Sequence, residues 1–136
     1  MPFMQWSDKL SVGVKRFDRD HEKLVGLLNE LYDATLEGHG KAALGPVVRD
    51  LGAYVDRHFT DEEQCMRAFD FPGLDAHMRE HDAFRARLAG MREHAADSAT
   101  LALSMEVVSF LRDWLLRHIV HTDKRYQSFL NAKGIK

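Results

Sequence analysis

Residues 58–81, HFTDEEQCMRAFDFPGLDAHMREH, contain two pairs of metal-ligand residue types at the same spacing. His58 and Glu62 are four residues apart, and so are His77 and His81. On an α-helix such a pair lies one turn apart on one face, so it can direct two donor atoms at one point. The Pro-Gly turn between the pairs predicts two successive helices that double back on each other. This stretch therefore predicts a helical hairpin that carries a metal site.

A single pair of this kind has a simpler explanation, because His and Glu on a helix are usually solvated surface residues. Two pairs that flank one tight turn favour a metal site instead, because both have the i, i+4 spacing that lets two side chains bind one ion. The other ligands must come from the rest of the chain.

The composition is that of one ordinary domain. A chain of 136 residues, expected to form a single domain over 1–136, can bury a core without disulfides. Its apolar fraction of 45% and charged fraction of 29% are typical of soluble globular proteins. The net charge is −2 and no run of Lys or Arg exceeds two residues, which argues against a nucleic-acid or anionic-membrane surface.

Two features of the sequence bear on the cellular location of the protein: a single cysteine and the lack of a long apolar stretch. Cys65 has no partner for an internal disulfide, which favours a reducing environment. Nothing resembles a signal peptide, and no apolar stretch approaches the length of a membrane span. We expect a cytoplasmic protein without membrane insertion.

The first part of the chain predicts an extended arm over residues 1–17, followed by a bundle over 18–131. Trp6 is expected to anchor the arm on the bundle. Asp18 or Asp20 can cap the first helix, which ends at the glycines around His39. Its inward positions repeat at steps of three and four: His21, Leu24, Val25, Leu28, Leu31, Tyr32 and Leu36.

Three more amphipathic helices follow. The start of the second is open, because Pro46 fits only a first turn without kinking the helix. The third helix begins near Leu74 and fades over 93–98. The fourth runs from about residue 101 to about 130, and Asp97 or Ser98 can cap its start. Their inward positions are Val47, Val48, Leu51, Val55, His58, Glu62, Met66 and Phe69; His77, His81, Phe84, Leu88 and Met91; and Val108, Leu111, Leu115, Ile119, Tyr126 and Phe129. The pattern predicts an all-α, antiparallel up-down-up-down four-helix bundle.

Counting residues on either side of each turn places all the candidate ligands at one level of this bundle. For example, His21 lies 18 residues before the turn at residue 39, and His58 lies 19 after it. Imidazoles and carboxylates buried in one layer are costly unless they are paired or bind metal. The predicted ligands are His21, His58, Glu62, His77, His81, His118 and Asp123. His39, His94 and His121 are expected at the surface.

The ordered motifs closely resemble those of the bacterial hemerythrins, over essentially the whole chain. They comprise Trp6 and Ser11-Val12-Gly13-Val14; Phe17-Asp18 and Asp20-His21; His58-Phe59, Glu62-Glu63 and Met66; Phe71-Pro72, His77 and His81; and Trp114-Leu115, His118-Ile119, Asp123 and Tyr126. The resemblance also settles one spacing. Helix geometry alone would place Thr122, at i+4, beside His118, whereas the family pattern selects Asp123.

The resemblance implies a non-haem di-iron centre that binds dioxygen. Three imidazoles (His77, His81 and His118) would bind one iron and two (His21 and His58) the other, while both carboxylates and an oxo or hydroxo group bridge the pair. The second iron would keep a vacant position for dioxygen. Phe59, Ile119 and Val120 are candidates to keep water away from it.

Three classes of function remain open. The first is a non-enzymatic protein that carries, stores or senses dioxygen, expected to be a monomer with an unknown client. The second is a di-iron enzyme acting on oxygen, peroxide or nitric oxide. The third, a bundle with a structural metal such as zinc, is disfavoured because structural zinc takes four closed ligands rather than seven around two metals.

Overall fold

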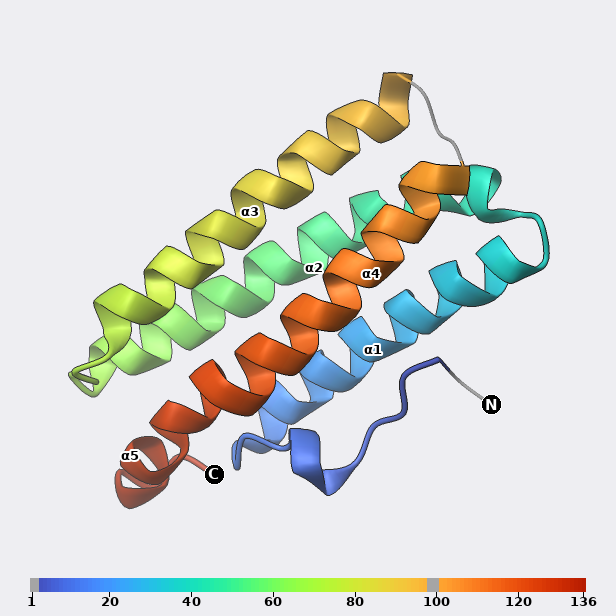
Figure 1. The fold of residues 1–136 in the computed structure, drawn as a ribbon. Helices are drawn as coiled ribbons and strands as arrows, with labels where there is room; N and C mark the ends of the chain where they lie inside the picture. The colour runs from blue at the N-terminus through green and yellow to red at the C-terminus, as the bar shows by residue number, and fades with distance from the viewer. Residues whose placement is uncertain (1–2, 98–100) are drawn as a thin grey trace.

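The chain folds into an antiparallel bundle of long helices. The structure, a computed structural model, describes residues 3–97 and 101–136. Its long helices are α1 (Lys15–Leu36), α2 (Gly40–Ala68), α3 (Leu74–Asp97) and α4 (Leu101–Arg117), and they run side by side (Figure 1). A 3₁₀ turn, η1 (Asp8–Leu10), lies in the N-terminal arm. The predicted all-α four-helix bundle is confirmed, and no described helix is long and apolar enough to cross a membrane.

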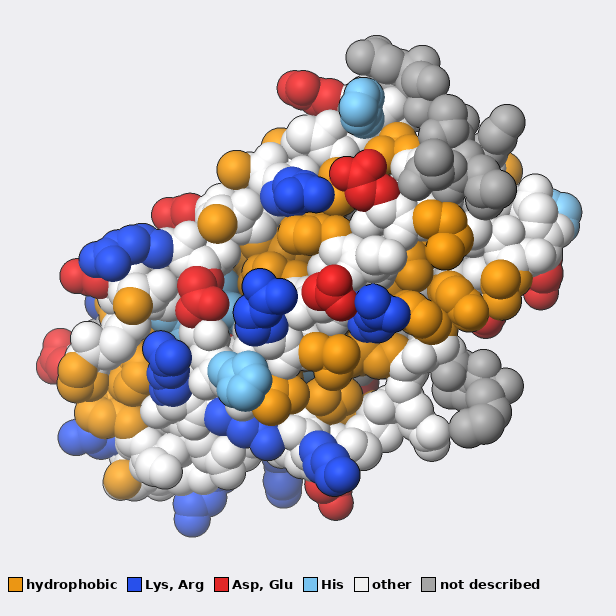
Figure 2. Space-filling view, in the orientation of Figure 1, with side chains coloured by type: hydrophobic (Ala, Val, Ile, Leu, Met, Phe, Trp, Pro, Cys, Tyr) orange, Lys and Arg blue, Asp and Glu red, His pale blue; other side chains and the backbone are white. Residues whose placement is uncertain are grey.

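The helices bury one apolar face each, as their periodicity predicts. Leu28, Leu31, Val48 and Leu111 are at most 1% exposed. The prediction for Leu36 is wrong, because its side chain is 67% exposed at the end of α1. Figure 2 shows charged side chains of both signs interspersed with hydrophobic ones on the viewed face.

The arm is shorter than expected, because α1 begins at Lys15 and includes Phe17. Val14 occupies the N-cap position, so neither Asp18 nor Asp20 caps the helix. Asp18 instead fixes the arm: its carboxylate accepts hydrogen bonds from Ser11 Oγ at 2.6 Å and from the Val12 N–H at 2.8 Å. The Asp18 carboxylate in the first turn of α1 therefore binds the N-terminal arm and does not cap the helix.

Two helices are followed by a residue in the left-handed backbone conformation. At the end of α1, Gly38 has a φ of 83° and the His39 N–H donates to the Ala34 carbonyl at 2.7 Å. At the end of α2, Asp70 has a φ of 57° and the Phe71 N–H donates to Met66 at 2.9 Å. Both closures satisfy free carbonyls of the last helical turn. Phe69 is consequently the C-cap of α2 and not a helical residue.

Pro46 lies inside α2, which begins six residues earlier at Gly40. The proline lacks the N–H that would donate to a preceding carbonyl, which costs helix stability. Leu44 is fully buried, and its packing stabilises the turn ahead of the proline. At the other end of the hairpin, α3 continues to Asp97 rather than fading. The proposed cap at Ser98 lies outside the described residues.

The fourth helix is not one continuous α-helix, contrary to the prediction. After Arg117 the chain forms a π-helical turn, η2 (His118–Thr122), and a 3₁₀ turn, η3 (Asp123–Tyr126). A final short helix, α5 (Gln127–Ala132), completes the chain. These turns lie at the level of the candidate ligands and change which side chains face the core.

Candidate metal centre

The structure brings all seven predicted ligand residues into one layer of the bundle. None is more than 2% exposed. The residues come from α1, α2, α3 and the irregular turns after α4. The set is His21; His58 and Glu62; His77 and His81; and His118 and Asp123.

Five donor atoms form one cluster. The Nε2 atoms of His77 and His118 each lie 2.8 Å from Asp123 Oδ1. His81 Nε2 lies 3.2 Å from His118 Nε2 and 3.2 Å from Glu62 Oε1. These five residues could hold one metal ion.

His21, His58 and Glu62 form a second group that could hold a metal ion, and Asp123 Oδ2 lies beside it as a fourth donor atom. His21 Nε2 and His58 Nε2 are 3.0 Å apart. The other oxygen of each carboxylate faces them, with Asp123 Oδ2 3.2 Å from His21 and Glu62 Oε2 3.4 Å from His58. Glu62 and Asp123 thus place one oxygen in each cluster, which is the arrangement of two bridging carboxylates.

The positions of the donor atoms suit binding to a pair of metal ions better than hydrogen bonding among themselves. Neighbouring ligands of an octahedral ion lie about 3.0 Å apart when the bonds are about 2.1 Å, close to the spacings observed here. Although they lie close to one another, several buried donor atoms make no hydrogen bond of suitable geometry with the described residues: His77 Nε2, Glu62 Oε1, and both carboxylate oxygens of Asp123. Unpaired buried polar atoms are costly, so a bound cation would relieve them.

The π-helical turn explains the five-residue spacing of two ligands. The Asp123 N–H donates to the His118 carbonyl, an i to i+5 bond that adds one residue to the turn. His118 and Asp123 therefore face the same cluster, while His121 points to solvent and is exposed. A regular α-helix would have placed Thr122 nearest the position that Asp123 takes.

Two further carboxylates orient the imidazoles from behind. Asp20 Oδ2 lies 2.8 Å from His58 Nδ1, and Glu63 Oε2 lies 2.7 Å from His81 Nδ1. A proton held on each Nδ1 leaves the Nε2 lone pair free for metal. Neither role was predicted from the sequence. The sequence does contain a signal for them, because Asp20 and Glu63 each lie next to a predicted ligand. A residue next to an inward-facing position on a helix can face the neighbouring helix.

These two carboxylates are themselves held by residues nearer the surface. Tyr54 donates its hydroxyl proton to Asp20 Oδ1 at 2.7 Å, and Arg85 Nη1 donates to Glu63 Oε2 at 3.2 Å. The Asp20 carboxylate raises the pKa of Tyr54, together with burial, to about 12. Both outer groups therefore remain protonated donors at neutral pH.

Tyr126 connects the C-terminal turns to a bridging carboxylate. Its hydroxyl, fully buried, donates to Glu62 Oε2 at 2.6 Å. Burial and the Glu62 charge raise the pKa of Tyr126 well above its usual value. The sequence predicted this residue only as a core position.

Aromatic rings close the layer on several sides. Phe59 stacks on His81 with centroids 3.7 Å apart, and Trp114 stacks on His118 at 4.3 Å. Phe17 meets His58 edge-on at 5.8 Å. Phe59 therefore packs against the five-donor cluster, whereas Phe17 lies beside the four-donor cluster. Of the other expected pocket residues, Ile119 is fully buried and Val120 is partly exposed.

The electrostatics keep both shared carboxylates, Glu62 and Asp123, charged. Burial alone would raise the pKa of Glu62 and of Asp123, but the facing imidazoles lower both pKa values below normal. Burial alone would lower the pKa of His58 and of His77, but the carboxylates raise them to about 10 and about 9. A metal ion would take the place of these protons.

The remaining histidines lie at the surface, as the sequence predicted. His39, His94 and His121 are exposed, and none belongs to either donor cluster. Cys65 is a free, buried thiol.

The fold and the site define a class: a four-helix bundle with two adjacent buried donor clusters, formed by five imidazoles and two shared carboxylates, that could hold a pair of metal ions. Residues 12–130 match the Hemerythrin HHE cation binding domain. The chain belongs to the hemerythrin family, whose members bind oxygen at a di-iron site.

Individual relatives agree over nearly the whole chain. A bacteriohemerythrin of Ralstonia nicotianae (strain ATCC BAA-1114 / GMI1000) is 34% identical, covering 98% of this chain and 93% of its own length. A myohemerythrin of Theromyzon tessulatum is 27% identical, covering 93% and 92%. A crystal structure of wild-type hemerythrin superposes with a TM-score of 0.82 at 28% identity, covering 93% and 96%.

Proposed function

We propose that this protein binds dioxygen reversibly at a non-haem di-iron centre, in order to carry, store or sense it. The observation that carries the proposal is the asymmetry of the donor clusters. One cluster has five protein donors and the other has four, although the two share both carboxylates. A six-coordinate ion in the second cluster would have more room for an external ligand than one in the first.

In this proposal each residue has a defined role. His77, His81 and His118 would hold one iron, and His21 and His58 would hold the other. Glu62 and Asp123 would bridge the irons together with a solvent-derived oxo or hydroxo group. The bound iron pair supplies the electrons and the open position that dioxygen requires.

The residues around the centre favour binding over turnover. Imidazole ligands suit iron, and only two carboxylates donate negative charge, fewer than in the Glu-rich di-iron proteins. Phe17, Phe59 and Trp114 pack around the imidazoles and exclude water, which protects a bound ligand from protons. Both features support release of intact dioxygen.

The test is repeated oxygenation and deoxygenation of the reduced, iron-loaded protein. We expect one dioxygen per two irons, and absorption bands that appear with oxygen and vanish when it is removed. Continuous consumption of oxygen in the presence of a reductant would instead indicate an oxidase. Turnover of peroxide or nitric oxide under the same conditions would indicate a reductase.

A variant pair tests the exclusion of water. Phe17→Ala opens the side of His58, in the four-donor cluster, whereas Leu28→Ala removes a fully buried core side chain elsewhere on α1. We expect the oxygenated spectrum to decay faster in air for Phe17→Ala than for Leu28→Ala. Equal decay rates would contradict a protective role of Phe17.

We further propose that the protein acts as a monomer in a reducing, cytoplasmic environment. The single free cysteine and the mixed charges of the surface in Figure 2 support this proposal. Sedimentation of the iron-loaded protein would test the oligomeric state.

A further inference from the structure

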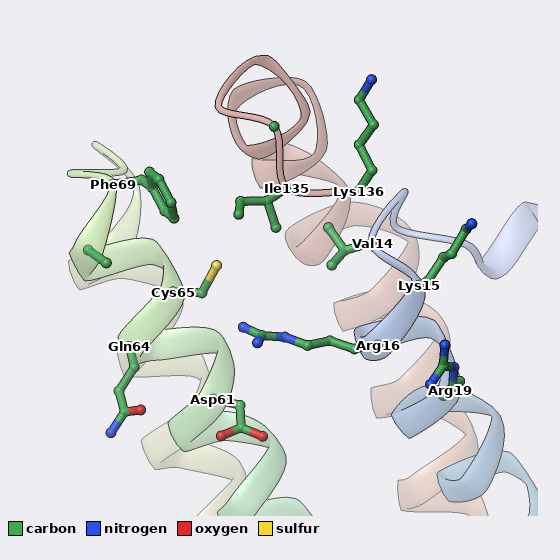
Figure 3. Close-up of a pocket in the computed structure, with 12 residues that line it drawn as sticks. Val14, Lys15, Arg16, Arg19, Asp61, Gln64, Cys65, Phe69, Ile135 and Lys136 are labelled. Atoms are coloured by element: carbon green, nitrogen blue, oxygen red, sulfur yellow. The ribbon is translucent and has the colours of Figure 1, made fainter.

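A pocket of about 650 Å³ opens at the end of the bundle where α1 begins. Its walls come from the first turns of α1, the last turns of α2 and the segment that follows α5 (Figure 3). None of its lining residues belongs to either donor cluster. The metal centre therefore does not explain this pocket.

Positive charge dominates one side of the pocket. Lys15, Arg16 and Arg19 line it from α1, and Asp61 is the one carboxylate side chain among the lining residues. Within the described part of the chain, none of the three cations has an ion-pair partner. Other arginines do pair with carboxylates, for example Arg85 with Asp56, Glu63 and Asp82.

Apolar side chains line another part of the pocket. Val14, Phe69 and Ile135 line it together, and Figure 3 shows Ile135 lying between the other two. Arg16 extends across the pocket from α1 toward the thiol of Cys65 on α2 (Figure 3). A guanidinium next to an apolar wall offers paired N–H donors and a contact surface within one cavity.

From these features we propose that the pocket is a binding site for a small organic anion, with its oxyanion group held by the Arg16 guanidinium, which extends across the pocket (Figure 3). Its apolar body packs against Val14, Phe69 and Ile135. The volume is in the range of small-molecule sites, which combine apolar walls with a few placed polar groups. Carboxylates and phosphates share the required chemistry, because both accept two hydrogen bonds from one guanidinium.

The experiment is calorimetric titration of the full-length, iron-loaded protein. The probes are phenyl phosphate and phenylacetate, with phenol and inorganic phosphate as single-feature controls. We expect at least one organic anion to bind saturably with a Kd at or below about 1 mM, and both controls to bind at least tenfold more weakly. The tighter of the two organic anions identifies the preferred oxyanion.

Matched arginine variants locate the site. Arg16→Gln should weaken binding about tenfold. Arg49→Gln removes the same charge from an exposed α2 residue outside the pocket and should change the affinity less than twofold. The bound anion should also slow alkylation of Cys65 by iodoacetamide, because the thiol lines the pocket.

Three results would overturn the proposal. The first is the absence of saturable binding by either organic anion. The second is equal affinity for an organic anion and for one of its controls, since this would remove the need for either the charge or the apolar wall. The third is an equal effect of Arg49→Gln and Arg16→Gln.

Discussion

Tyr126 shows how one buried hydroxyl can control a bridging ligand. Its O–H donates to Glu62 Oε2, the carboxylate oxygen that faces His58 in the four-donor cluster. This bond fixes the carboxylate plane and withdraws charge from one oxygen only. Residues that hydrogen-bond to a metal-ligating side chain change the affinity of the site for metal.

Replacing Tyr126 with Phe should weaken iron binding. The substitution keeps the ring but leaves a buried carboxylate oxygen without its donor, so we expect the iron affinity to fall about tenfold. Competition with an iron chelator measures this change. Tyr32→Phe is the control, because Tyr32 is partly exposed and remote from the donor clusters. Equal chelator sensitivity of both variants would show that the hydroxyl does not act on the metal.

Two neighbouring histidines provide a test of the ligand assignment. His118→Ala removes one of three imidazoles from the five-donor cluster, so the purified protein should lose most of one iron per chain. His121→Ala removes an exposed side chain and should retain two irons. Metal analysis together with the optical spectrum measures both. The assignment fails if the two variants lose iron equally.

At the level of secondary structure, the π-helical turn acts like one residue inserted into α4. The i to i+5 bond between Asp123 and His118 lengthens the turn, and His121 is displaced toward solvent. Turns of this kind occur mostly at functional sites because they rotate the side chains that follow. Here the rotation brings Asp123 into the metal layer.

Deleting His121 should convert the π turn into an α turn. The two ligands would then be four residues apart on one helical face, and the segment after them would keep its register. We expect this variant to fold and to retain both irons. Deleting exposed Ser109 from the regular part of α4 should instead rotate His118 away and abolish iron binding. Circular dichroism and iron content distinguish the two outcomes, and loss of both irons from the His121 deletion would contradict the mechanism.

At the scale of the whole molecule, the metal layer interrupts the apolar core. Seven ionisable ligands cross the bundle between layers of buried Leu, Val and Phe side chains. Their charges are balanced only in part by one another, as the unpaired donor atoms show. The layer therefore weakens the metal-free bundle and strengthens the metal-bound one.

Removing iron should lower the melting temperature. A ligand present at about 1,000 times its Kd stabilises the folded state by about 4 kcal/mol. For a domain of this size we expect the metal-free protein to melt roughly 10–20 °C lower. Thermal unfolding before and after chelation measures the shift, and returning iron should reverse it. Identical melting curves would show that the donors are satisfied without metal.

The sequence by itself determined the bundle and predicted which residues meet in one buried layer of it. Apolar periodicity and three turns predicted four antiparallel helices, and equal distances from those turns placed the ligand residues at one level. Such information is local, because helix period and turn position depend on near neighbours in sequence. The structure gathered the seven predicted ligands into two donor clusters at that level.

The tertiary structure decided how those residues are used. Asp20 reaches His58 from α1, Glu63 reaches His81 from α2, and the hydroxyl of Tyr126 meets Glu62 across the bundle. The π-helical turn likewise has no local signature in the printed sequence, since α-helix geometry favours Thr122. These features depend on side chains that meet across helices, so their positions become fixed only when the bundle has packed.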